Sequence, residues 1–275
     1  MKSIVIAGTI LLLTSAVCST ESYNEKGLIH LNAGRYHQAI EQFNKAIARD
    51  SAHAEAYNNL GLAYLGLGMD HNALRVFSRS TVLDSASSKS FTNQGNVLLR
   101  LGKSEEAAVA LARAVAIDST DSHALNSLAL LAAETGEYDQ ALGLLERAVE
   151  LNPEQADAYV NLGNVYILLE QPVEAAAAYK TALIYRPDYP EVWMSLGTAY
   201  ARADMYPEAI EQWERVKPYY PNDPNVHKNL GMAYAYLDST GRAVREFRRF
   251  LKLAPDAEGT EAIREYLIGV RSLDE

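Results

Sequence analysis

Amide and hydroxyl side chains recur in this sequence at one fixed place, in most copies directly before a leucine. The column consists of Glu25, Asn59, Asn93, Ser127, Asn161, Ser195 and Asn229. Two further amides, Asn96 and Asn164, each follow a member of the column by three residues, which is about one turn of a helix. An amide both donates and accepts hydrogen bonds, so it can pair with both halves of a peptide bond. The column predicts a row of contacts for the backbone of an extended peptide, with polar residues on a wet helix face as the alternative.

No group of residues has the spacing that catalysis or metal binding requires. The run 66–68 begins like a dinucleotide-binding loop, but His71 takes the place of its third glycine and no predicted strand precedes it. His37 and His71 occupy equivalent places in neighbouring units, roughly 18 Å apart, which is too far to share a metal. The adjacent carboxylates at 105 and 106 point to different sides of a helix. We therefore expect no enzymatic activity, no metal and no cofactor.

These side chains must be positioned by a unit that returns every 34 residues. A glycine column, with alanine in one copy, runs through Gly27, Gly61, Gly95, Ala129, Gly163, Gly197 and Gly231. An unbroken alanine column runs through Ala39, Ala73, Ala107, Ala141, Ala175, Ala209 and Ala243. One bulky column consists of Tyr23, Tyr57, Phe91, Leu125, Tyr159, Trp193 and His227, and another of Phe43, Phe77, Leu111, Leu145, Tyr179, Trp213 and Phe247. Seven units therefore fill residues 20–257 without an insertion.

Each unit is predicted to form two helices joined by a tight turn. In the unit 54–87, apolar residues recur at helical spacing in both halves, and Gly66 and Gly68 interrupt the pattern between them. A glycine inside a helix costs about 1 kcal/mol relative to alanine, so its recurrence indicates close helix packing. We expect the glycine column to face the alanine column, unit-end serines such as Ser85 to cap the next helix, and His227 to pack like the aromatic residues of its column.

These motifs carry a family resemblance. The 34-residue period, with "AYNNLGLAY" followed by "NALRVF" and a serine or proline at the unit end, resembles the tetratricopeptide repeat. The resemblance predicts seven repeats: 20–53, 54–87, 88–121, 122–155, 156–189, 190–223 and 224–257. It implies an all-α fold, a right-handed superhelical solenoid of helix-turn-helix repeats whose first helices line a concave face. Such a fold carries no chemistry by itself.

On that fold the amide column lies on the concave face. It resembles the asparagine-lined superhelix of O-linked N-acetylglucosamine transferase, which binds extended peptides, although the catalytic domain of that enzyme has no counterpart here. The predicted peptide-binding residues are Asn59, Asn93, Asn96, Ser127, Asn161, Asn164, Ser195 and Asn229. Inner-face bases are expected at Lys89, Arg100, Arg202 and Lys228. Because acidic residues outnumber them on that face, we do not expect a carboxylate-binding clamp.

The N-terminal residues 1–19 depart from the repeat and have the pattern of a secretory signal. A basic residue precedes an apolar run that is too short to span a membrane, and small residues follow. Cys18, the only cysteine, resembles the lipid-attachment site of a bacterial lipoprotein, but Ser15 and Val17 depart from the usual pattern. The alternative is cleavage elsewhere, for example after Ala16. The sequence predicts export, as a membrane-anchored lipoprotein or as a periplasmic or secreted protein.

The C-terminal residues 258–275 are predicted to form a capping helix and tail. Ile263, Tyr266, Leu267 and Val270 make an apolar stripe that is expected to cover the last repeat. The preceding basic stretch "GRAVREFRRFLK" is expected to be the solvated outer face of that repeat, with contact to anionic lipid or an acidic partner as the alternative.

The net charge of the chain limits the classes of partner that it can bind. A net charge of −10 disfavours nucleic acid, whose binding depends on neutralising phosphates. We therefore expect a protein or extended peptide as partner, bound by a non-catalytic scaffold of the bacterial cell envelope. Two alternatives are a lipid-anchored component of a secretion or pilus machine that uses convex or edge surfaces, and a regulatory subunit of an envelope enzyme.

Overall fold

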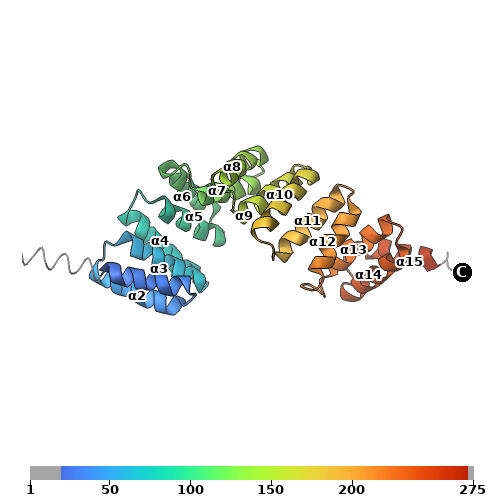
Figure 1. The fold of residues 1–275 in the computed structure, drawn as a ribbon, viewed down its shortest axis with the longest axis horizontal. Coiled ribbons are helices and arrows are strands. Elements are labelled where there is room, and N and C mark those ends of the chain that lie inside the picture. Colours follow the sequence, from blue (N-terminus) through green and yellow to red (C-terminus); the bar gives the residue numbers. More distant parts are fainter. Residues whose placement is uncertain (1–19, 272–275) are drawn as a thin grey trace, which may run out of the picture. The chain divides into compact units, whose positions relative to one another are not determined.

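The computed structural model describes residues 20–271, in which all regular elements are helices (Figure 1). A helical segment over residues 20–32 comes first. It is followed by α2 (Tyr36–Arg49), α3 (Ala54–Gly66), α4 (Asp70–Leu83), α5 (Ser88–Arg100), α6 (Ser104–Ile117), α7 (Ser122–Glu134), α8 (Tyr138–Leu151), α9 (Ala156–Leu168), α10 (Pro172–Tyr185), α11 (Pro190–Arg202), α12 (Tyr206–Val216), α13 (Pro224–Tyr236), α14 (Thr240–Leu253) and α15 (Thr260–Arg271). The predicted all-α repeat fold is confirmed: in chain order these helices make seven helix-turn-helix pairs, and α15 follows.

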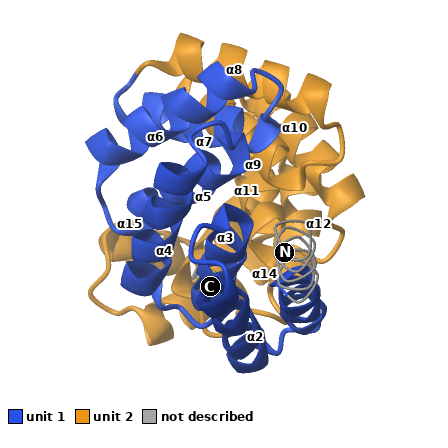
Figure 2. Ribbon diagram, turned by 90° about the vertical axis from the view of Figure 1, so that its left-hand side faces the viewer, with its two compact units in different colours: residues 1–136 blue, residues 137–275 orange. Residues whose placement is uncertain are grey.

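The chain divides into two compact units, coloured separately in Figure 2. Unit 1 extends to Gly136 and ends after α7, and unit 2 begins at Glu137 with α8. Within each unit, every helix from α2 on packs against the next helix along the chain. Each unit therefore builds its core from neighbours in sequence, as expected for stacked helix pairs.

The turn inside each helix pair contains a residue with positive φ, always at the same place in the 34-residue period. The first four turns use glycine, at Gly34, Gly68, Gly102 and Gly136, with φ between 68° and 81°. The last three use acidic residues, Glu170, Asp204 and Asp238, with φ of 58°, 58° and 53°. Glycine takes this left-handed conformation without strain, whereas a residue with a Cβ is disfavoured there. The shape of the turn is thus constant although its residue type changes between the units.

The two small-residue columns lie in the core. All seven members of the alanine column are fully buried. The atoms nearest to a glycine of the column belong to a bulky side chain: a Cβ placed on Gly61 would lie 2.5 Å from the ring of Phe77, and one on Gly163 would lie 2.6 Å from the ring of Tyr179. The glycine leaves room for the bulky side chain of its partner helix.

The first helices of several pairs are capped by the residue directly before them. The Ser87 hydroxyl accepts a hydrogen bond from the Ser90 amide at 3.3 Å, and the Asp121 carboxylate accepts from the His123 and Ala124 amides at 3.1 and 3.0 Å. These bonds satisfy amides that have no partner inside the helix. Ser85, the expected cap, lies two residues earlier in the turn, so that expectation is wrong by two positions.

The last repeat is covered by α15. Ile263 is 7% exposed and belongs to the same buried cluster as Phe247 and Phe250. The Tyr266 ring packs edge-on against Phe247, with ring centroids 5.3 Å apart and planes at 73°. The stripe predicted from the sequence is therefore the face that α15 turns toward α14.

Candidate functional site

In unit 1, members of the amide column are bonded to the preceding repeat. Asn59 is 5% exposed, and its Nδ2 donates to Oδ1 of Asn24 at 3.1 Å. The Nδ2 of Asn93 donates in the same way to Oδ1 of Asn58 at 2.9 Å. Each bond joins residues 35 apart in the chain, so a hydrogen bond between two amides links one repeat to the next. Asn59 is therefore part of the structural frame, whereas Asn93 is only half-buried.

These amides border a cavity of about 450 Å³ in unit 1. Its lining consists of Asn58, Asn59, Leu62, Lys89, Thr92, Asn93, Asn96, Asp121 and His123. Ser127, another predicted site residue, donates to Oδ1 of Asn96 at 2.6 Å. Asp121 is held by its neighbours, because its carboxylate accepts from the hydroxyls of Ser88 and Thr92 at 2.7 Å each. The cavity presents mainly neutral hydrogen-bonding groups, which suit a peptide backbone.

In unit 2, two of the predicted site residues meet at one tyrosine. The Tyr179 hydroxyl donates to Oδ1 of Asn164 at 2.6 Å. Burial raises the pKa of Tyr179 to about 12, against the opposing effects of the Ser195 hydroxyl and the Arg202 charge. Tyr179 therefore remains a neutral donor at physiological pH. Asn161, on the same face of α9, is half-buried.

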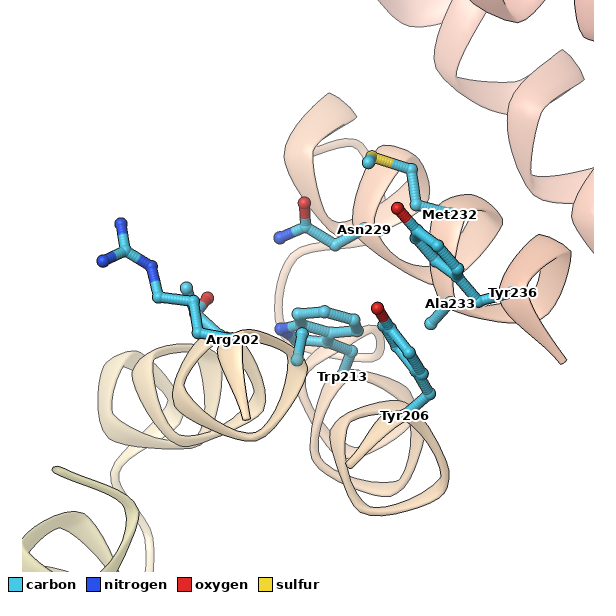
Figure 3. Close-up of a pocket in the computed structure, with 9 residues that line it drawn as sticks. Arg202, Tyr206, Trp213, Asn229, Met232, Ala233 and Tyr236 are labelled. Atoms are coloured by element: carbon cyan, nitrogen blue, oxygen red, sulfur yellow. The ribbon is translucent and has the colours of Figure 1, made fainter. Parts of the chain in front are cut away.

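Asn229 lies in a second pocket, of about 240 Å³, whose aromatic lining the sequence analysis did not identify (Figure 3). The lining consists of Thr198, Ala201, Arg202, Tyr206, Trp213, Asn229, Met232, Ala233 and Tyr236. The rings of Tyr206 and Tyr236 stack at 4.6 Å with an angle of 10°. In the first pair the equivalent ring, Tyr36, lies against Gly66, where an added Cβ would be 2.3 Å away. Tyr236 takes the place of Gly66 in the period, and its ring forms one wall of the pocket.

A buried charged cluster joins α12, α13 and α14. Glu246 is 4% exposed and its two carboxylate oxygens lie 2.7 Å from the Lys217 ammonium and 2.7 Å from Nδ1 of His227. The other ring nitrogen of His227 lies 3.1 Å from the Pro221 carbonyl, so both ring nitrogens have a hydrogen-bond partner. Burial alone raises the pKa of Glu246, but the hydrogen bonds and charges of Lys217 and His227 outweigh it and hold that pKa below its ordinary value. His227 is thus a polar link and not the simple packing residue expected.

Residues 20–271 contain no group of three or more histidine, cysteine or carboxylate side chains that could hold a metal ion. Among the described helices, none combines the length and the apolar character that crossing a membrane requires. Cys18 and the predicted signal lie outside the described residues.

Comparisons with known families match most of the chain to one kind of repeat. Models described as "TPR repeat" and "Tetratricopeptide repeat" match residues 27–68 and 131–169, residues 166–233, and residues 54–86 and 88–121. No match was found among curated protein sequences.

Solved structures show the same fold at low sequence identity. A structure of the APC/C hetero-tetramer Cut9-Hcn1 has a TM-score of 0.71 at 19% identity, over 89% of this chain and 48% of that one, so the chain spans about half of its length. PilW, described as a widely conserved type IV pilus biogenesis factor, has a TM-score of 0.68 at 17% identity, over 76% and 97% of the two chains. YrrB, described as a TPR protein with an unusual peptide-binding site, has a TM-score of 0.62 at 22% identity, over 69% and 97%.

Proposed function

Because the chain is a tetratricopeptide repeat protein, we propose that it is a non-catalytic scaffold that binds an extended peptide or protein segment along the first helices of its repeats. Proteins built of this repeat typically act as interaction scaffolds, and nothing found in residues 20–271 points to an enzymatic activity. YrrB, which has the same fold, is described as having a peptide-binding site. That description concerns YrrB, and the support from this chain comes from its own groups.

The observation that carries the proposal is the amide-lined cavity of unit 1. Asn93 uses one N–H toward Asn58 and keeps its second N–H and its oxygen available. Asn96 uses its oxygen toward Ser127 and keeps both of its N–H groups. Donors and acceptors of this kind, held in place by bonds between repeats, can pair with a peptide backbone largely without regard to its sequence.

The proposal is tested by removing half-buried amides and leaving the structural Asn59 in place. The triple variant Asn93→Ala, Asn161→Ala and Asn229→Ala is expected to bind an immobilised library of unstructured peptides on the order of a hundredfold more weakly. This estimate takes about 1 kcal/mol for each lost contact. Folding should persist because alanine favours helix more than asparagine does, which circular dichroism and thermal melting will check.

A matched control replaces three asparagines that line neither groove cavity, Asn44, Asn72 and Asn225, with alanine. This control is expected to bind the library like the unaltered chain. If the triple groove variant binds the library as well as the unaltered chain does, the proposal is overturned. Binding through the second helices of the repeats is then the alternative. There Val82, Val109 and Ile184 are 72%, 73% and 71% exposed, as a component of a secretion or pilus machine docking through its outer surface would require.

We further propose that the scaffold works at the bacterial cell envelope, tethered by lipid on Cys18. The support is the sequence of residues 1–19 alone, with its basic start, short apolar run and single cysteine. Expressed in a Gram-negative host, the chain is expected to enter the detergent-soluble membrane fraction, and Cys18→Ser is expected to release it. Mass spectrometry that finds an unmodified chain beginning at Val17, Ser19 or Thr20 would contradict the tether and leave the groove proposal intact.

A further inference from the structure

Arg202 has lost the partner that its equivalent in an earlier repeat retains. Arg100 stands three repeats before it, and its guanidinium contacts the Asp70 carboxylate at 2.9 and 3.2 Å. Pro172 stands where Asp70 stands, at the start of the preceding second helix. Within residues 20–271, Arg202 makes no hydrogen bond or ion pair, and it is one of the residues that line the aromatic pocket.

Asn229 has lost its partner in the same manner. Asn59 and Asn93 donate to amides 35 residues earlier, Asn24 and Asn58. The residue 35 positions before Asn229 is Met194, which cannot accept such a bond well. Asn229 makes no hydrogen bond to another residue of the described part of the chain. The arginine and the asparagine that bond to other residues in unit 1 therefore have no such bonds at the equivalent places in unit 2. Arg202 and Asn229 both line one pocket.

The rest of that pocket is apolar and partly exposed. Trp213, 3% exposed, is fixed against Gly197 and bonds through Nε1 to the Met194 carbonyl at 3.3 Å. Tyr236 and Met232 are 63% and 43% exposed. Exposed aromatic and methionine side chains around a concavity are typical of binding sites, because covering their apolar surface with a ligand is energetically favourable. Figure 3 shows Arg202 on one side, the tyrosine pair on the other, and Asn229 and Trp213 between them.

An extended peptide can present two of its side chains to one face of the pocket at once. In such a chain, residues two positions apart point to the same face and are separated by roughly 7 Å. Resting on the proposed groove function, we propose that the unit 2 pocket selects a segment with a large apolar residue and an acidic residue two positions apart. The apolar side chain covers the tyrosine pair, the carboxylate pairs with Arg202, and Asn229 bonds to the intervening peptide group.

Three labelled peptides test the proposal against the full chain by fluorescence anisotropy. The probe is Gly-Ser-Phe-Ser-Glu-Ser-Gly, and the comparison peptides replace its phenylalanine by alanine or its glutamate by glutamine. Each replacement is expected to weaken binding about tenfold, the usual weight of a buried ring or of a charge-assisted hydrogen bond. Arg202→Gln is expected to abolish the preference for glutamate over glutamine, and Tyr236→Ser the preference for phenylalanine over alanine.

Arg100→Gln is the matched control, because Arg100 is the equivalent residue outside this pocket, and it is expected to keep both preferences. Equal binding of the three peptides, or a glutamate preference that survives Arg202→Gln, overturns the proposal. If the unstructured library is still bound in that case, groove binding stands and only the selectivity fails. If neither the library nor the probe binds, the groove function fails as well.

Discussion

Glu246 is a residue whose charge is buried and fully compensated. Removing a carboxylate from water costs several kcal/mol, and this cost is offset only when partners satisfy both oxygens. Lys217 and His227 do so here at 2.7 Å each. The cluster ties α12, α13 and α14 together at the end of unit 2, so its loss affects three helices at once.

We expect Glu246→Ala to destabilise the chain by about 3–5 kcal/mol, because it removes the acceptor that Lys217 and the buried His227 share. The pKa of Glu246 is lowered from its ordinary value of 4.5. The stability it contributes is therefore complete above that value and is lost as the pH falls through the lower folded value. Urea unfolding at neutral and at progressively acidic pH checks this. A variant whose stability differs from the unaltered chain equally at every pH would contradict the ionic role.

Single residues also mark the limit of what the sequence predicted. The glycine and alanine columns, the helix pairs and the turns follow directly from the 34-residue period. Which side chain each glycine meets does not, because Gly61 and Phe77 lie on different helices and their contact depends on how those helices cross. The amide pairs were missed for the same reason, since the bond from Asn59 to Asn24 depends on the step between repeats. The period fixed the position of each residue along a helix, but its partner was set by packing.

At the scale of the helix, adding a Cβ to a glycine is expected to have opposite effects on stability in two neighbouring helices of unit 2. Gly163 in α9 faces the Tyr179 ring, whereas Gly143 in α8 has no atom within 4 Å of an added Cβ. A Cβ at the first position overpacks the pair, and at the second it only improves helix propensity. The same residue type is thus a packing requirement in one helix and a weakness in the next.

We expect Gly163→Ala to destabilise unit 2 by about 1–3 kcal/mol through overpacking. We expect Gly143→Ala to stabilise it by up to about 1 kcal/mol, since alanine loses less backbone entropy in a helix. Denaturant unfolding of both variants, compared with the unaltered chain, measures the two changes. A loss of equal size at both positions would show that helix propensity, and not the ring contact, governs Gly163.

At the scale of the whole molecule, stability should be local, because each helix packs mainly on its neighbours in the chain. The cap shows what this implies. Ile263 of α15 is 7% exposed and sits in the last buried cluster, whereas Ile268 of the same helix is 67% exposed. Damage to the cap should loosen the last repeat and leave distant repeats unchanged.

We expect Ile263→Ala to cost about 2–4 kcal/mol and to speed hydrogen exchange in α13, α14 and α15. Exchange in α3 and α4 should be unaltered. The control Ile268→Ala should stay within about 0.5 kcal/mol and leave exchange unchanged everywhere. Exchange measured by mass spectrometry resolves these segments, and uniform acceleration along the chain would contradict local stability.

Trp213, held between the Gly197 backbone and the Met194 carbonyl, has an optical consequence for the molecule. The chain has two tryptophans, and the other, Trp193, lies on the adjoining helix of the same pair. Both belong to unit 2, so ultraviolet emission from indole reports the state of that unit and is blind to unit 1. Where the indole signal and the far-ultraviolet dichroism change at different denaturant concentrations, the two halves unfold separately. The chain therefore carries its own reporter for whether its repeats melt together.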